Sequence, residues 1–201
     1  MQRWRYFWAI RLPNRAPVRC DQLRFGGPTG EGVVSLSTTG SRLAAFDALP
    51  ERDAVLELVS VCAAPEWAAE VAAGRPYPSL EALLARADEV LAGLAESQVD
   101  AALAGHPRIG ERAAGLSSRR EQSRVVTAAS EVLDALVEGN REYEERFGHV
   151  YLVRADGRSA EELLAVLRER LGNDPATERR VLRGELAKIN RLRLSRLFPD
   201  G

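Results

Sequence analysis

Helical periodicity is the feature that most limits what this chain can fold into. From Ser41 to about Leu197, apolar residues recur at three- and four-residue spacing, the period of amphipathic helices that pack on a core. Prolines and glycines divide this stretch into segments of helical length. The sequence therefore predicts an all-α, single-domain, multi-helix bundle, with helices expected over residues 41–49, 52–63, 65–74, 79–93, 97–105, 119–147, 159–171 and 175–197.

Two of these helices begin with explicit start signals, and one segment between helices departs from the pattern. Ser79 is placed to cap a helix, and Asp174 is placed to cap another whose first residue is Pro175.

Residues 150–153 read Val-Tyr-Leu-Val, the one β-like run of the helical part. We expect a short β-like segment there, between two helices.

The first 40 residues follow no such period. They hold three prolines and five glycines, and we predict a poorly ordered extension in which residues 33–36 are the only candidate strand. The expected organisation is therefore an N-terminal extension at residues 1–40 and a helical domain at residues 41–198.

Charge and composition exclude several kinds of partner. The chain has 28 basic and 29 acidic residues, a net charge of -1, which offers no basic surface for nucleic acid or anionic membranes. No run approaches the roughly 18 apolar residues of a membrane span, and residues 1–10 lack the features of a signal peptide. Cys20 and Cys62 have no disulfide-framework spacing, which fits a reducing compartment. We expect a cytoplasmic protein without nucleic-acid or membrane partners.

Patterns for metals and organic cofactors are also missing from the sequence. There is no paired-cysteine, His-x-x-x-His or Glu-x-x-His spacing for a metal. The glycine-rich stretches lack phosphate-loop and dinucleotide fingerprints. We therefore expect no metal site and no cofactor, so that any chemistry falls to ordinary side chains.

His106 is the first candidate for such chemistry, because it is one of only two histidines and is followed by Pro107. A proline disfavours helix for the residue before it, which holds His106 at a stiff junction past a helix end. Ile109 should turn this loop inward. A loop histidine that caps a helix or faces water is the alternative, but an imidazole fixed at a junction can transfer protons near neutral pH.

Polar side chains at the start of the following helix are the second candidate. Ser118 and Glu121 match the capping box that begins helices, so capping alone could explain them. The same helix start would also bring a carboxylate to the His106 junction. Gln122 and Asn140 share an otherwise apolar stripe of that helix, and buried amides there need either structural or ligand partners.

Arg193 is the third candidate, because it interrupts the apolar stripe of the last helix. An arginine on such a face is rarely buried unless it pairs with an anion. Two partners are equally reasonable: an internal carboxylate such as Glu121, or an anionic substrate.

Several short motifs, taken together in chain order, resemble one family. The chain resembles the 2-oxo-4-hydroxy-4-carboxy-5-ureidoimidazoline (OHCU) decarboxylases over about residues 43–197. The Trp67 segment and the Arg-Pro-Tyr connector at residues 75–77 also fit. Each motif is weak alone, and the ordered set is specific: His-Pro-Arg-Ile-Gly at 106–110, Ser-x-x-Glu-Gln at 118–122, Asn-x-x-Tyr-x-x-x-Phe-Gly at 140–148, Gly-Arg-Ser at 157–159, Arg-Leu-x-Asn at 170–173 and Leu-Arg-Leu at 192–194.

The resemblance implies an all-α homodimer that needs no metal or organic cofactor and converts OHCU to (S)-allantoin and carbon dioxide in urate degradation. Its functional partners would be urate oxidase and hydroxyisourate hydrolase, which act before it. Carried over by motif, His106 and Glu121 are the catalytic pair. The implied substrate-binding residues are Pro107, Ser118, Gln122 and Arg193, with backbone groups of residues 150–155, including Val150 and Leu152, lining the pocket. Arg154 departs from the family, which is usually apolar or has cysteine there.

Two rival functions remain. A non-catalytic helical interaction protein would keep the scaffold and use Arg193 in an internal salt bridge, but it would not need His106, Glu121 and Gln122 in combination. A decarboxylase acting on a related ureido-imidazoline would keep them all. Turnover of OHCU discriminates among the three.

Overall fold

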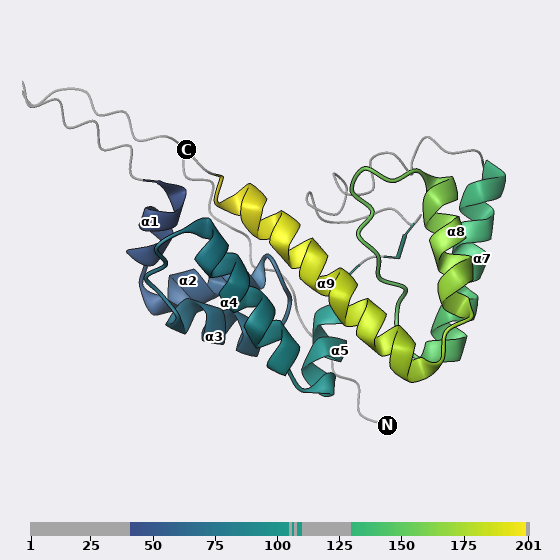
Figure 1. Cartoon of the computed structure of the whole chain (residues 1–201), viewed down its shortest axis with the longest axis horizontal. Coiled ribbons are helices and arrows are strands. Elements are labelled where there is room, and N and C mark those ends of the chain that lie inside the picture. Colours follow the sequence, from purple (N-terminus) through teal and green to yellow (C-terminus); the bar gives the residue numbers. More distant parts are fainter. Residues whose placement is uncertain (1–40, 105, 107, 110–129, 200–201) are drawn as a thin grey trace, which may run out of the picture. The chain divides into compact units, whose positions relative to one another are not determined.

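The computed structural model describes residues 41–104, 106, 108–109 and 130–199. Its helices carry the labels of Figure 1. They are α1 (Arg42–Asp47), α2 (Glu51–Val59), α3 (Pro65–Ala73), α4 (Leu80–Gly93), α5 (Glu96–Ala104), α7 (Ser130–Phe147), α8 (Ala160–Leu171) and α9 (Pro175–Leu197). Across these described residues there is no strand, so the predicted all-α class is confirmed. The expectations for residues 1–40 lie outside the described residues, and the division at residue 40 stays a prediction.

The helix starts follow the capping residues read from the sequence. Ser79 Oγ accepts from the backbone N–H of Ala82 at 3.2 Å, and Asp174 caps α9, whose first residue is Pro175. At the start of α8, Ser159 and Glu162 form a reciprocal capping box. Because these caps satisfy backbone N–H groups that a helix leaves unpaired, they fix where each helix begins.

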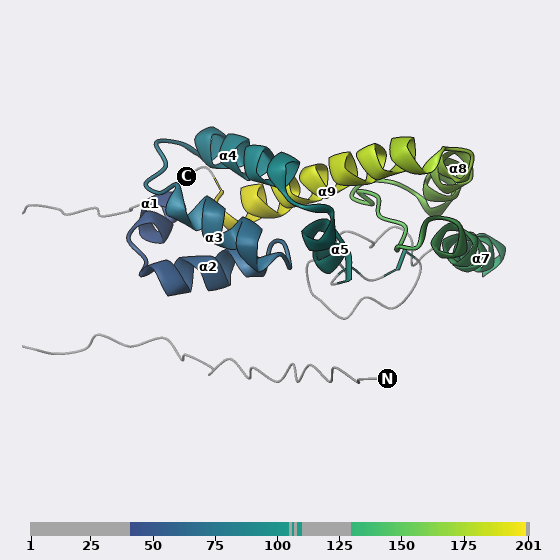
Figure 2. The ribbon, with the colours of Figure 1, turned by 90° about the horizontal axis from the view of Figure 1, so that it is seen from below.

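One hydrophobic core joins helices α1, α2, α3, α4 and α5 with α9. It is centred on large buried side chains, among them Phe46, Leu58, Trp67, Leu83, Leu91, Leu182 and Leu186. The indole N–H of Trp67 donates to the Ala87 carbonyl at 2.9 Å and so ties α3 to α4. The two views show α4 and α5 beside α9 (Figures 1 and 2).

A second core lies between α7 and α8, which run side by side in both views (Figures 1 and 2). Leu136 and Tyr143 of α7 meet Leu163 and Leu167 of α8. A Cβ on Gly139 would come within 2.7 Å of Leu167 Cδ2, so the glycine permits this close approach of the two helices.

The β-like run at residues 150–153 forms no strand in the described structure, so the prediction of β-like structure there is wrong. Its residues alternate between the cores: Leu152 belongs to the first, and Tyr151 and Val153 belong to the second. Alternation of this kind is what an extended chain gives, because successive side chains point to opposite sides. Burial on both sides, rather than pairing in a sheet, explains the apolar composition.

Helix lengths differ from expectation at two places. Helix α2 ends at Val59, four residues before its expected end at residue 63. The helix expected over residues 119–147 is described only as α7, from Ser130, and its beginning lies outside the described residues. The longest helix of the described part is α9, with 23 residues. None of the described helices is long and apolar enough to cross a membrane.

Candidate active site

His106 lies directly after α5, where the sequence predicted a stiff junction. Its backbone N–H donates to the Leu103 carbonyl at 2.9 Å and closes the end of the helix. Its ring Nδ1 lies 3.0 Å from the Ala102 carbonyl oxygen. A carbonyl can only accept, so this contact requires the proton on Nδ1. In the neutral ring, Nε2 then keeps a free electron pair.

Arg193 reaches the same place from α9, 87 positions further along the chain. Its Nη1 donates to the Val61 carbonyl at 2.9 Å and lies 3.4 Å from His106 Nε2. A guanidinium can only donate, so the electron pair of Nε2 faces the charge. The apolar stripe around Arg193 is also as predicted, since Leu182, Leu186 and Ile189 are buried. The structure therefore brings together an imidazole and a cation.

The loop after His106 is anchored to α7 by Asn140. The side-chain Nδ2 of Asn140 donates to the Ile109 carbonyl at 3.0 Å and to the Leu136 carbonyl at 2.7 Å. Ile109 is 5% exposed and belongs to the second core, so the loop is turned inward as expected. Of the two partners considered for a buried amide on this stripe, Asn140 has the structural one.

An ion pair on the outer side of the same loop adds a second tie to α7. Arg108 donates to both carboxylate oxygens of Glu144, at 2.5 and 2.8 Å. These hydrogen bonds lower the pKa of Glu144, although partial burial opposes them. Both side chains are partly exposed, so the pair contributes little to stability.

Residues 150–155, which we call the wall because the resemblance assigns them to the side of the pocket, form backbone hydrogen bonds along one edge. The Leu152 carbonyl accepts from Arg170 Nη1 at 2.7 Å, and the backbone N–H of Arg154 donates to Glu185 Oε2 at 2.7 Å. Among the residues that the structure describes, none forms a hydrogen bond with the backbone of Tyr151 or Val153. Buried backbone groups are normally paired, so this second edge has unused hydrogen-bonding capacity.

The sequence reasoning missed Arg170, Glu185 and Asn190. Arg170 follows Leu163 and Leu167 on the buried face of α8, the same signal that identified Arg193. Glu185 is likewise buried on α9; burial acts to raise its pKa, but hydrogen bonds from Arg154 and Lys188 lower it overall. Asn190 is 1% exposed, and neither amide atom has a hydrogen-bonding partner among the described residues.

Cys62 lies beside Asn190 and Arg193 at the end of α2. Burial raises the pKa of its thiol, and the neighbouring Asn190 and Arg193 only partly offset that effect. A thiol with a raised pKa is a poor nucleophile near neutral pH. Cys62 therefore serves as packing beside the His106 and Arg193 pair.

Four predicted site residues lie outside the described residues: Pro107, Ser118, Glu121 and Gln122. The pairing of His106 with Glu121 stays a prediction. Of the others, Leu152 is buried in the first core and Val150 packs against it. Within the described ranges, no group of three or more His, Cys, Asp or Glu side chains could hold a metal ion.

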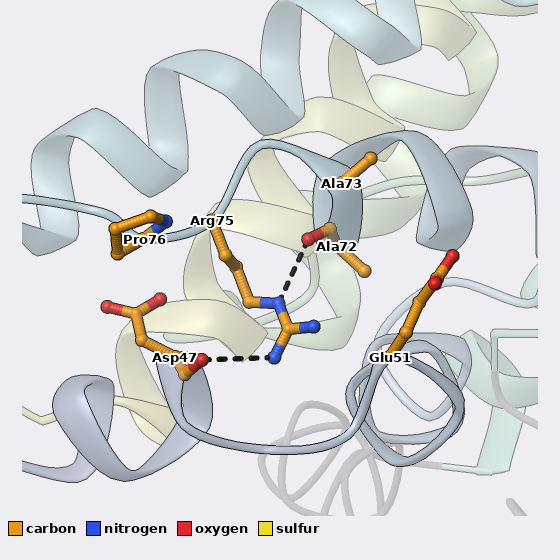
Figure 3. Close-up of a pocket in the computed structure, with 6 residues that line it drawn as sticks. All are labelled: Asp47, Glu51, Ala72, Ala73, Arg75 and Pro76. Carbon is orange, nitrogen blue, oxygen red and sulfur yellow. Dashed lines mark hydrogen bonds between the residues drawn. The ribbon is translucent and has the colours of Figure 1, made fainter.

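Two of the cavities formed by the described residues bear on the location of the site. The first, of about 290 Å³, extends from the end of α5 to the start of the wall; its lining comprises Asp100, Leu103, Ala104, Gly148, His149 and Val150. It therefore lies next to the His106 junction. The second, of about 340 Å³, is lined by Asp47, Glu51, Ala72, Ala73, Arg75 and Pro76 (Figure 3).

The cavity of Figure 3 is structural. Its arginine, Arg75, donates to the Ala72 carbonyl at 2.9 Å and to the carbonyls of Phe46 and Leu49 at 2.8 Å each. The guanidinium thus satisfies carbonyl groups at two helix ends. None of the predicted site residues lines this cavity.

Comparisons with known proteins identify a family. The family model described as OHCU decarboxylase matches residues 47–195. A 2-oxo-4-hydroxy-4-carboxy-5-ureidoimidazoline decarboxylase of Amia calva is 34% identical over 147 residues, which are 70% of this chain and 81% of the relative. A uric acid degradation bifunctional protein of Arabidopsis thaliana is 29% identical over 147 residues, 69% of this chain but only 45% of the relative. The chain thus spans less than half of that longer protein.

A solved structure supports the same relationship. The crystal structure of an OHCU decarboxylase in the presence of (S)-allantoin matches with a TM-score of 0.65 and 28% identity, over 72% of this chain and 98% of that one. The match covers nearly the whole of that protein, so the described helices reproduce its fold.

Proposed function

Because this chain belongs to the OHCU decarboxylase family, we propose that it is a carboxy-lyase that converts OHCU to (S)-allantoin and carbon dioxide in urate degradation. The observation that carries the proposal is the approach of Arg193 Nη1 to His106 Nε2, at 3.4 Å, from distant parts of the chain. An interaction scaffold has no need for an imidazole electron pair facing a guanidinium.

The reaction needs a cation and a proton-transfer group, and this pair supplies both. The substrate carries a carboxylate, and Arg193 offers a planar set of N–H donors that matches carboxylate geometry. His106 lies beside that position with one ring nitrogen bonded to the Ala102 carbonyl. The other ring nitrogen, Nε2, is the atom that would exchange a proton with the substrate.

The substrate itself can accept the electrons that decarboxylation releases. As the bond between C4 and the carboxylate breaks, carbon dioxide leaves and the electron pair moves toward the C=N bond at C5. The ring nitrogen of that bond takes up a proton, a second proton is added at C5, and the C4 hydroxyl loses its proton to become the carbonyl of allantoin, so that one proton is consumed overall. Addition of the proton from one face gives the (S) product. We assign His106 and Glu121 to these proton transfers.

The remaining groups would orient the ring. The unused backbone edge of Tyr151 and Val153 can pair with the amide-like groups of the ureido chain and ring, which carry both donors and acceptors. In this proposal Pro107, Ser118 and Gln122 are further substrate-binding residues. Val150 and Leu152 contribute through the apolar packing that keeps the wall in place.

The assembly and location of the protein are further parts of the proposal. We expect a homodimer in the cytoplasm, functionally coupled to urate oxidase and hydroxyisourate hydrolase, which generate the substrate. Light scattering of the full chain in solution tests the dimer: a mass of one 22.0 kDa chain would contradict it.

The activity test generates OHCU in place from urate with the two upstream enzymes and follows (S)-allantoin by circular dichroism. The wild-type chain should accelerate its formation above the slow spontaneous reaction, which gives racemic product. Arg193→Ala and His106→Ala should each lower kcat/KM by about 100-fold or more. Arg191→Ala is the matched control, because Arg191 lies on the same helix and pairs with Asp88 at 2.5 Å; it should keep wild-type kinetics.

Two outcomes would contradict the proposal. No acceleration by the wild-type chain would favour an interaction protein or a decarboxylase of a related ureido-imidazoline. Near wild-type turnover by His106→Ala would remove the histidine from the mechanism.

A further inference from the structure

A buried ion pair between α8 and α9 has no part in the chemistry described so far. Arg170 is 5% exposed and Glu178 is fully buried. Arg170 Nε donates to Glu178 Oε1 at 2.9 Å, and Nη2 donates to the same oxygen. Burial acts against the charged guanidinium, but the hydrogen bonds with Glu178 raise the pKa of Arg170 overall, so the guanidinium stays charged.

The pair is the centre of a larger polar network. The Tyr143 hydroxyl donates to Glu178 Oε1, and Asn173 Nδ2 donates to the other carboxylate oxygen at 2.8 Å. Burial and the bond to Glu178 raise the pKa of Tyr143, so the phenol keeps its proton and acts as a donor. The Arg170 guanidinium also lies over the Tyr151 ring, 4.8 Å from its centroid. Helices α7, α8 and α9 all meet at this network.

Stability alone does not account for such a pair. Removing two charges from water costs free energy that their mutual attraction often fails to return, and apolar side chains of similar size can replace buried pairs without loss. One contact of Arg170 has no apolar substitute: Nη1 donates to the Leu152 carbonyl at 2.7 Å. That bond fixes the backbone of the wall.

The geometry of the wall shows what this bond determines. In an extended segment, the backbone groups of alternate residues share one edge. Leu152 and Arg154 are bonded, to Arg170 and Glu185 respectively, so their edge faces α8 and α9. The unbonded groups of Tyr151 and Val153 are consequently directed to the opposite edge.

The same network is connected to the histidine junction through α7. Tyr143 lies three residues after Asn140, and Asn140 holds the Ile109 carbonyl at 3.0 Å. One helix therefore joins the network that fixes the wall to the bond that fixes the loop of His106.

Resting on the proposed function, we propose that Arg170 is a positioning residue for the decarboxylation. It does not touch the substrate; it sets the direction of the Tyr151 and Val153 backbone groups and so the angle at which the substrate meets His106. A misplaced wall still binds the substrate but presents it out of line, and small misplacements have large effects on rate. The effect should therefore fall mainly on kcat.

The test is the double variant Arg170→Met with Glu178→Gln in the full chain. The glutamine still accepts from the Tyr143 hydroxyl and leaves no buried charge, so the fold should persist, while the Leu152 carbonyl loses its donor. Arg170→Lys is the second variant, since one ammonium group cannot serve Glu178 and Leu152 with the geometry of a guanidinium. Trp67→Phe is the control: it removes the bond to the Ala87 carbonyl, a buried tie remote from the wall.

Kinetics are measured on OHCU at a temperature where circular dichroism shows every variant folded. Both Arg170 variants should lose about 10- to 100-fold in kcat with less than a threefold change in KM, while Trp67→Phe lowers only the melting temperature. Wild-type kcat in either folded Arg170 variant would overturn the positioning role and leave the decarboxylase proposal intact. An inactive wild-type chain would instead contradict the proposed function itself.

Discussion

Replacing Asn140 with leucine tests whether the histidine junction depends on a single buried amide. Asn140 Nδ2 donates to two carbonyls, those of Ile109 and Leu136. The Leu136 carbonyl lies within α7, where it also accepts a hydrogen bond from a backbone N–H, so it stays paired when the Asn140 side chain is removed. The Ile109 carbonyl lies in the loop, and a buried carbonyl that loses its donor costs roughly 1–3 kcal/mol.

A second contribution to the free energy of unfolding favours the variant. Asn140 Oδ1 is buried without a hydrogen-bonding partner among the described residues, so its removal offsets part of the destabilisation caused by the lost bond to Ile109. We expect a net loss of about 1–2 kcal/mol, which for a domain of this size lowers the melting temperature by roughly 2–8 °C. Because Ile109 is only three residues from His106, we also expect kcat/KM to fall by about tenfold.

The measurements are thermal unfolding by circular dichroism and OHCU kinetics well below the transition. Val137→Leu is the control, since Val137 is 50% exposed on the same helix and exposed substitutions change stability by less than about 0.5 kcal/mol. A variant with unchanged or raised melting temperature would refute the reasoning. It would show that the unpaired Oδ1 costs more than the bond to Ile109 contributes.

Four further predictions concern other parts of the structure. Arg193→Lys should lower kcat/KM by about 100-fold with the fold retained, because an ammonium cannot reproduce the planar donors that reach Val61 and His106; wild-type kinetics would contradict this. Glu185→Gln should be less stable than wild type at pH 7. The pKa of this carboxyl in the folded protein is lowered from its ordinary value of 4.5, so the stability that it contributes is present above that value and is lost as the pH falls through the folded pKa. In urea unfolding, the difference in free energy of unfolding between variant and wild type should therefore shrink below about pH 4.5. A difference that does not change with pH would refute this prediction. Ser159→Ala removes one side of the capping box of α8 and should cost about 1 kcal/mol in urea unfolding; no change would show that the cap is redundant. Dialysis against a chelator should leave kcat unchanged, and loss of activity restored by a metal would overturn the cofactor-independent proposal.

Local features of this fold could be read from the sequence because their causes are local. Ser79 and Asp174 cap helices through backbone groups two or three residues away. The stripe around Arg193 follows from helical spacing alone. The turn of the His106 loop into the core follows from Pro107 and an apolar residue after it. In each case, the interacting groups lie within a few residues of one another.

The parts that sequence reasoning missed depend on residues distant in the chain. Nothing near Arg170 reveals that it bonds the Leu152 carbonyl, 18 positions away. The Val-Tyr-Leu-Val run has the composition of a strand, and only the packing of two cores against it explains why no sheet forms. Asn190 is buried beside Cys62, and this neighbour from the end of a distant helix is visible only in the folded chain.

The segment after Gly148 has a consequence for how the protein loses activity. Its side chains belong alternately to the two cores, so neither core can separate from the other without displacing the residues between them. The region is therefore not an independently melting loop, as many binding segments are. We therefore expect activity and helical structure to be lost in the same thermal transition. On heating, activity should not disappear at a lower temperature than the helices.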